Sequence, residues 1–156
     1  DGIEKLLKII ENCMSSFPSL ETHTITMVIE ATLNPTNNKR LLQILGLVKR
    51  KQKFIPPDLY ANALSSIFEN SGKSKALQTH KDLKKFTNIS LIFQSNIDLL
   101  KHLLKYDSSE ANILLGRADK SVLEQPKLQQ TMKEFIKEHP KLITDKVQAK
   151  IKNASK

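Results

Sequence analysis

The sequence contains little glycine, few aromatic residues and a single cysteine. Its 156 residues include 4 glycines and no tryptophan, and aromatic residues make up 5% of the chain. Because β-rich proteins use glycine in turns and aromatic residues in strands, this composition favours helices. The only cysteine, Cys13, excludes an internal disulfide and a cysteine-rich metal cluster, and it indicates a reducing or neutral compartment.

Long apolar runs and the short motifs of catalytic sites are also absent. No uninterrupted apolar stretch approaches the roughly 18 to 20 residues that cross a membrane. The chain has no Gly-rich phosphate loop, no His-Glu-x-x-His and no Gly-x-Ser-x-Gly. Its 4 histidines have no partners at the spacing of metal ligands. We therefore expect neither an enzyme nor a bound metal or cofactor.

Basic residues outnumber acidic ones. The chain has 25 Lys and Arg residues against 16 Asp and Glu residues, which gives a formal net charge of +9 and a pI near 9.6. Such an excess favours polyanionic partners, either nucleic acid or an anionic membrane surface.

The clearest internal similarity recurs every 35 residues. Residues 41–45 align with residues 6–10, 76–80 and 111–115. Two apolar rows follow the same period, and they consist of Ile29, Leu64 and Leu99, and of Leu33, Phe68 and Leu103. Turn-forming residue types recur at the same spacing, at Asn37, Gly72 and Asp107. The period therefore predicts pairs of helices joined by short turns.

This pattern predicts an all-α fold, an α-α superhelix (solenoid) of 35-residue helix-turn-helix repeats. The expected helices cover residues 3–15, 20–33, 38–52, 58–70, 74–86, 90–106 and 108–118, with a looser C-terminal pair within 127–151. They form one domain over 1–156, with units at about 1–19 (partial), 20–57, 58–92, 93–124 and 125–156. Because Gly2 aligns with the turn residues Asn37 and Gly72, we expect the chain to be a fragment of a longer protein.

One unit carries a family pattern. It reads Pro57-Asp58-Leu59-Tyr60-Ala61-Asn62-Ala63-Leu64, followed by Gly72-Lys73-Ser74-Lys75-Ala76-Leu77. This unit resembles the pentatricopeptide repeat, in which a Pro-Asp pair precedes a helix with Tyr and Asn, a glycine separates the helices, and an Ala-Leu pair lies early in the second. The other units carry fewer of these residues, and the Lys/Asn-rich composition resembles degenerate fungal mitochondrial members of the family.

The resemblance implies a protein that binds single-stranded RNA and reads roughly one base per repeat. By position, the base-reading residue of this unit is Asn62 or Ala63. The end-of-unit position before it is Pro57 or Asp58. The equivalent readers of the neighbouring units are Met27 and Ile97. The resemblance also implies a mitochondrial (matrix) location and a role in the stability, processing or translation of an mRNA or rRNA.

The placement of charge gives an independent reason to expect RNA binding. The expected helices 20–33 and 58–70 contain no Lys or Arg. Basic residues cluster instead at the ends of the second helices, where they are Lys49, Arg50, Lys51 and Lys53, then Lys81, Lys84 and Lys85, then Arg117 and Lys120. A row of cations spaced by one repeat suits a phosphate backbone. The alternative is that these residues only complement the helix dipole, by about 0.3 to 1 kcal/mol each.

A second class of function stays open, a helical-repeat scaffold that binds other proteins, including as a component of a ribonucleoprotein assembly. Its expected signature is an apolar or mixed surface with dispersed cations. Cys13 aligns with Val48 and Leu83 in an apolar row, so we expect a buried core thiol rather than a nucleophile.

Overall fold

The computed structural model describes residues Gly2, Lys5, Lys8 and Ile9 and the continuous range 18–156. Every regular element in these residues is a helix, which confirms the all-α prediction. Cys13 and most of the helix expected over 3–15 lie outside the described residues. The chain divides into two compact units, unit 1 (Asp1–Thr87) and unit 2 (Asn88–Lys156).

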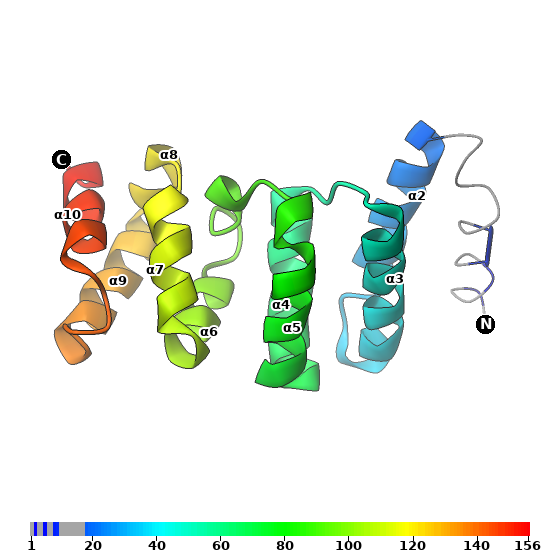
Figure 1. Cartoon of the computed structure of the whole chain (residues 1–156), viewed down its shortest axis with the longest axis horizontal. Helices are drawn as coiled ribbons and strands as arrows, with labels where there is room; N and C mark the ends of the chain where they lie inside the picture. Colours follow the sequence, from blue (N-terminus) through cyan, green and yellow to red (C-terminus); the bar gives the residue numbers. More distant parts are fainter. Residues whose placement is uncertain (1, 3–4, 6–7, 10–17) are drawn as a thin grey trace. The chain divides into compact units, whose positions relative to one another are not determined.

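The described part of unit 1 is built from helix pairs. Helix α2 (Pro18–Ala31) is followed by a short 3-10 turn (Pro35–Asn37) and by α3 (Asn38–Lys51). The next pair consists of α4 (Pro57–Ser71) and α5 (Lys73–Leu83), with a 3-10 turn (Lys84–Phe86) after it. Within this unit α2 packs against α3 and α4, and α4 also packs against α3 and α5 (Figure 1).

The core of unit 1 contains most of the residues of the two expected apolar rows, except that Leu33 follows the end of α2 and is half-buried. Ile29 and Leu64, one period apart, are buried, and so is Leu41 on α3. Tyr60 on α4 is buried as well, and its hydroxyl oxygen lies 2.6 Å from Nδ1 of His80 on α5. This contact joins the helices of one pair away from water, where a hydrogen bond contributes about 0.5 to 1.5 kcal/mol.

Unit 2 begins with a 3-10 turn (Ile89–Leu91) and continues with α6 (Ile97–Tyr106), α7 (Ser108–Arg117), the single-turn α8 (Lys120–Leu123), α9 (Pro126–Glu138) and α10 (Asp145–Ala154). Helix α6 packs against α7 and α9, while α10 packs against α7 and α8. Leu99 and Leu103 continue the two apolar rows and are buried. The helices α9 and α10 lie where the sequence predicts the C-terminal pair.

The second helices of the pairs keep the 35-residue period. Directly after the predicted turn residues, α3, α5 and α7 start at Asn38, Lys73 and Ser108. Gly72 has φ 89° and ψ 166°, a conformation that is essentially restricted to glycine. Asp107 instead has φ −154°, and its Oδ1 accepts a hydrogen bond from the Glu110 N–H at 3.1 Å. Gly72 and Asp107 occupy the same position in the period, but one turn depends on the backbone conformation of glycine and the other on a side-chain cap.

The first helices do not keep the period. Helices α2, α4 and α6 begin at Pro18, Pro57 and Ile97. The sequence pattern predicts the last of these helices from residue 90, but α6 begins only at Ile97. The Asn96 side chain accepts a hydrogen bond from the Leu99 N–H at 3.2 Å and caps the helix there. A local cap thus fixes the start of α6 later than the apolar pattern predicts.

Candidate nucleic-acid interface

Helices α3 and α5 end at the same side of unit 1 (Figure 1). The segments that follow them are joined by two hydrogen bonds. The backbone N–H of Ile55 donates to the carbonyl oxygen of Phe86 at 2.9 Å, and the Thr87 hydroxyl donates to the carbonyl oxygen of Ile55 at 2.8 Å. Ile55 and Thr87 are 32 residues apart in the chain, so these bonds bring two distant helix ends together.

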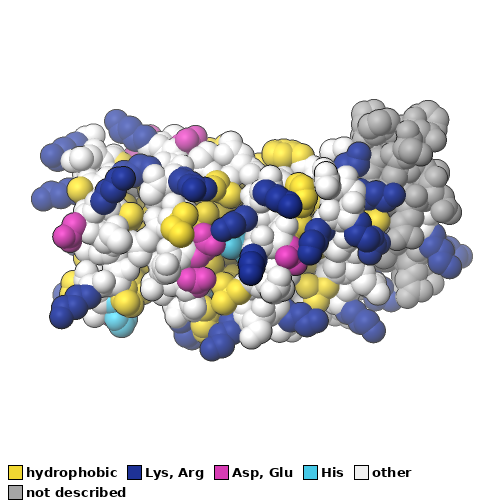
Figure 2. Space-filling view, in the orientation of Figure 1, with side chains coloured by type: hydrophobic (Ala, Val, Ile, Leu, Met, Phe, Trp, Pro, Cys, Tyr) yellow, Lys and Arg dark blue, Asp and Glu magenta, His cyan; other side chains and the backbone are white. Residues whose placement is uncertain are grey.

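The residues at these helix ends form a surface that we call the basic edge. It consists of Lys49, Arg50, Lys51 and Lys53 from α3 and the loop after it, and of Lys81, Lys84 and Lys85 from α5 and the turn after it. Asp82 lies among them, with its Oδ1 3.3 Å from Nζ of Lys49. Figure 2 shows Lys and Arg side chains over α3 and α5 with few acidic side chains between them. The structure thus brings together, within unit 1, cations that the sequence placed at two separate helix ends.

The end of α3 is fixed by a residue in the left-handed conformation. Gln52 has φ 54° and ψ 47°, and its N–H bonds back to the carbonyl oxygens of Val48 and Lys49. The helix therefore stops directly after Lys51, and the cations before it occupy the last turn, where the unpaired carbonyl groups favour positive charge. The helix dipole accounts for the position of those cations but not for Lys53, which lies beyond the helix.

An exposed aromatic side chain lies within the basic edge. Phe54 directly follows Lys53 and is 58% exposed. Phe86, in the turn after α5, is half-buried, and Nζ of Lys85 lies 5.2 Å from the centre of its ring. Sites for single-stranded nucleic acid combine cations along the backbone with aromatic rings on which bases stack. Sequence reasoning missed Phe54, although its place directly after a lysine-rich segment carried the signal.

No family model, curated protein or solved structure matches this chain. The chemistry of its surfaces is therefore the basis for assigning a function. No helix in the described range combines the length and the apolar character needed to cross a bilayer. Among the same residues, His, Cys, Asp and Glu side chains form no group of three that could hold a metal ion.

The predicted base-reading residues of unit 1 lie on the first helices of its pairs. Met27 on α2 is 55% exposed, and Asp58 and Asn62 are exposed on α4. Ala63 is buried, which favours Asn62 as the reader because a buried side chain cannot reach a base. Helices α2 and α4 pack against each other, so Met27 and Asn62 lie on neighbouring helices.

The readers do not occupy equivalent helical positions. Asn62 lies in the second turn of α4, whereas Met27 lies towards the end of α2 and Ile97 is the first residue of α6. Ile97 is half-buried and belongs to unit 2. Lys120 also belongs to unit 2, where it is exposed as the first residue of α8. Its alignment with the cations of the basic edge stays a prediction.

Proposed function

We propose that this protein binds single-stranded RNA through the basic edge and acts by binding alone. The observation that carries the proposal is the joining of the segments after α3 and α5, which brings the cations of two helix ends together beside a segment that carries the exposed ring of Phe54. RNA phosphates supply the negative charge that these cations attract, and their neutralisation releases counterions into solution.

The preference for a single strand follows from the aromatic ring. The face of Phe54 can stack only on a base whose own face is accessible, and bases in a duplex are already stacked. Cations alone would attract any polyanion, because every backbone phosphate carries negative charge in both single strands and duplexes. The pairing of ring and cations therefore supports RNA loops or unpaired segments as ligands.

The recurring helix pairs support a pentatricopeptide-type protein. The starts of the second helices keep the 35-residue period of the resembled family. In this proposal the pairs stack as a solenoid, Met27 and Asn62 contact bases, and Asp58 lies at the end-of-unit position. The amide of Asn62 can donate to and accept from a base edge, whereas Met27 offers apolar contact. From the same resemblance we propose a mitochondrial matrix location and a role in the stability, processing or translation of a transcript.

The proposal is tested by titrating a labelled oligouridine against the full chain at roughly 50 mM and 200 mM salt. We expect the affinity to fall as salt rises. A Lys51→Glu, Lys85→Glu double variant should bind at least about tenfold more weakly. It should also lower the slope of log affinity against log salt by about 1.4, because each neutralised phosphate contributes about 0.7 on a single strand.

A Lys39→Glu, Lys75→Glu double variant is the matched control. Both residues are exposed and lie in the first turns of α3 and α5, at the opposite ends of the same helices. The net charge changes equally, and acidic side chains are favoured at helix starts, so the fold is not weakened. Equal loss of RNA binding in both double variants would mean that overall charge, and not the basic edge, attracts RNA. A wild-type chain that fails to bind oligouridine would refute the proposal.

A further inference from the structure

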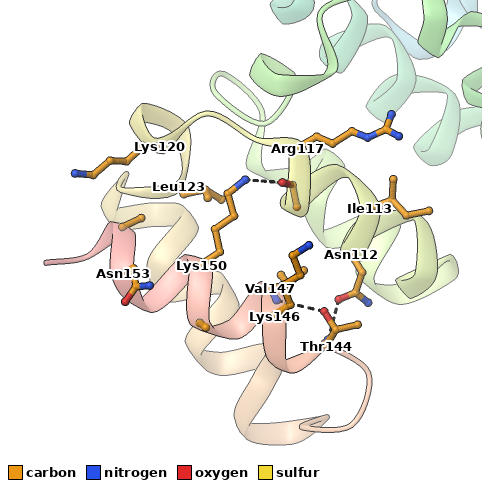
Figure 3. A pocket seen from close by; sticks show the side chains of 13 residues that line it. Asn112, Ile113, Arg117, Lys120, Leu123, Thr144, Lys146, Val147, Lys150 and Asn153 are labelled. Carbon is orange, nitrogen blue, oxygen red and sulfur yellow. Dashed lines mark hydrogen bonds between the residues drawn. The ribbon is translucent and has the colours of Figure 1, made fainter.

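Unit 2 carries a groove whose lining differs from that of the basic edge. The groove lies between α7, α8 and α10 and has a volume of about 920 Å³ (Figure 3). Ligand sites in proteins have volumes of roughly 300 to 1,000 Å³, so the groove is large enough to bind a partner segment.

Hydrogen bonds between distant segments fix the walls of the groove. The Asn112 side chain on α7 donates to the carbonyl oxygen of Leu142 at 2.7 Å and accepts from the N–H of Thr144 at 3.0 Å. Lys150 on α10 reaches across the groove and donates to the carbonyl oxygen of Gly116 at 2.5 Å (Figure 3). The segment before α10 and Lys150 of α10 itself are therefore both hydrogen-bonded to α7, so the groove exists before a partner binds.

The apolar side chains that line the groove are all aliphatic. Ile113 lines it and is 48% exposed, and Ala149 is exposed on α10 beside the buried side chain of Val147. Gly116 and Ala149 are small, and a Cβ added at Gly116 would meet no atom within 4 Å. Small residues beside larger apolar ones form the kind of groove into which the side-chain ridges of another helix pack. No aromatic residue is among the described residues that line it, so it offers no ring for base stacking.

Basic side chains surround this apolar lining. Arg117, Lys120, Lys146 and Lys150 all line the groove, whereas no Asp or Glu is among its described lining residues. Figure 3 shows Arg117 and Lys120 extending outward at the rim. A partner that covers the groove must therefore present apolar surface to its lining and negative charge to its rim.

We infer that this groove binds an acidic amphipathic helix of a partner protein. Such a helix places apolar side chains at positions i, i+3, i+4 and i+7 and carboxylates beside them. The apolar face covers Ile113 and Ala149, while the carboxylates pair with Arg117, Lys120 and Lys146. Single-stranded RNA matches the charge of the rim but not the aliphatic lining. This inference goes beyond RNA binding and does not depend on it.

The test is the fluorescence anisotropy of a labelled helical peptide of about 18 residues that carries Leu at those positions and Glu on both flanks. A matched peptide carries Gln in place of every Glu. We expect the full chain to bind the acidic peptide at least about tenfold more tightly than the Gln peptide, and to lose this preference at roughly 1 M salt. Equal affinity for the two peptides, or no binding of the acidic one, would overturn the inference.

Gly116 provides a variant that fills the groove from a position with open space. Gly116→Phe should weaken binding of the acidic peptide at least about tenfold, while the matched Gly116→Ala variant should stay within about threefold of wild type. Lys146→Glu tests the rim charge by itself and should weaken binding about fivefold. Far-UV circular dichroism reports whether each variant folds. If Gly116→Phe does not fold, the peptide affinity of Lys146→Glu decides the test. Unchanged binding in the folded variants would overturn the inference.

The charge-reversed basic edge separates this inference from RNA binding. The Lys51→Glu, Lys85→Glu variant should bind oligouridine at least about tenfold more weakly but keep its affinity for the acidic peptide within about threefold. Gly116→Phe should instead bind the acidic peptide more weakly and keep its affinity for oligouridine. Weaker oligouridine binding by Gly116→Phe, together with unchanged binding of the acidic peptide, would assign the groove to RNA and overturn the inference.

Discussion

The cations of unit 1 lie near an exposed aromatic residue in the chain, whereas those of unit 2 line a groove with the exposed aliphatic side chain of Ile113. In unit 1 the segments after α3 and α5 meet and leave Phe54 exposed within the basic edge. In unit 2 α10 packs against α7 and leaves Ile113 exposed in the groove. Both surfaces attract polyanions, so positive charge does not distinguish their partners. The side chains that lie between the cations make the difference, because bases stack on rings and helices pack on aliphatic grooves.

The turns inside the helix pairs also differ, and the largest expected change in stability lies there. Gly72→Asp places in unit 1 the residue type that unit 2 has at Asp107. A non-glycine residue held at the φ 89° and ψ 166° of Gly72 costs about 1 to 3 kcal/mol. We expect the free energy of unfolding to fall by that amount, measured by urea denaturation and far-UV circular dichroism. Ser74→Asp, an exposed site in the first turn of α5, is the control and should change little.

If Gly72→Asp proved as stable as the wild-type chain, the turn of unit 1 could adopt the capped geometry of unit 2. The difference between the two turns would then reflect the side chains present and not the packing around them.

Removing the aromatic ring from the basic edge should give the next largest effect. Phe54→Ala should weaken oligouridine binding about tenfold, because stacking contributes about 1 to 3 kcal/mol per base. Binding of the acidic peptide should not change. Leu142→Ala, which removes a 45% exposed apolar side chain from unit 2, is the control for loss of surface area. Equal oligouridine affinity for Phe54→Ala and wild type would mean that cations alone hold the RNA.

The sequence predicted the features that depend on residues close together in the chain. The second helices start directly after Asn37, Gly72 and Asp107, as the 35-residue period required. The cations at the end of α3 were predicted for the same reason, since they occupy one helical turn. The predicted start of α6 was wrong because apolar residues continue upstream of Asn96. Only the hydrogen bond from the Leu99 N–H to the Asn96 side chain shows where the helix begins.

The candidate sites could be predicted only in part, because they depend on contacts between distant residues. The basic edge exists as one surface through the hydrogen bond between Ile55 and Phe86, and no period reveals that bond. The groove in unit 2 depends on the contact between Asn112 and Leu142, 30 residues apart. Sequence reasoning assigned Lys120 to a row of RNA-binding cations and did not foresee the apolar groove beside it.

A substitution in the capped turn of unit 2 should lower the free energy of unfolding less than Gly72→Asp does in unit 1. Asp107→Ala removes the side-chain oxygen that accepts the hydrogen bond of the Glu110 N–H. Loss of such a cap costs about 1 kcal/mol, which urea denaturation can measure. Asp119→Ala is the matched control, since Asp119 precedes α8 without making a side-chain cap. Equal destabilisation by the two substitutions would mean that lost negative charge, and not the cap, weakens the fold.

The smallest expected effect tests directly whether the side chain between the cations selects the partner. Ile113→Tyr introduces a ring into the groove of unit 2, and the Lys51→Glu, Lys85→Glu background weakens RNA binding at the basic edge. In that background we expect Ile113→Tyr to raise the affinity for oligouridine about threefold, because part of a stacking contact becomes available among the cations of the groove. Ile113→Val is the control, since it keeps an aliphatic side chain. Equal oligouridine affinity for the Tyr and Val variants would mean that a ring among cations is not sufficient to attract RNA, and the contrast between the two surfaces would need another cause.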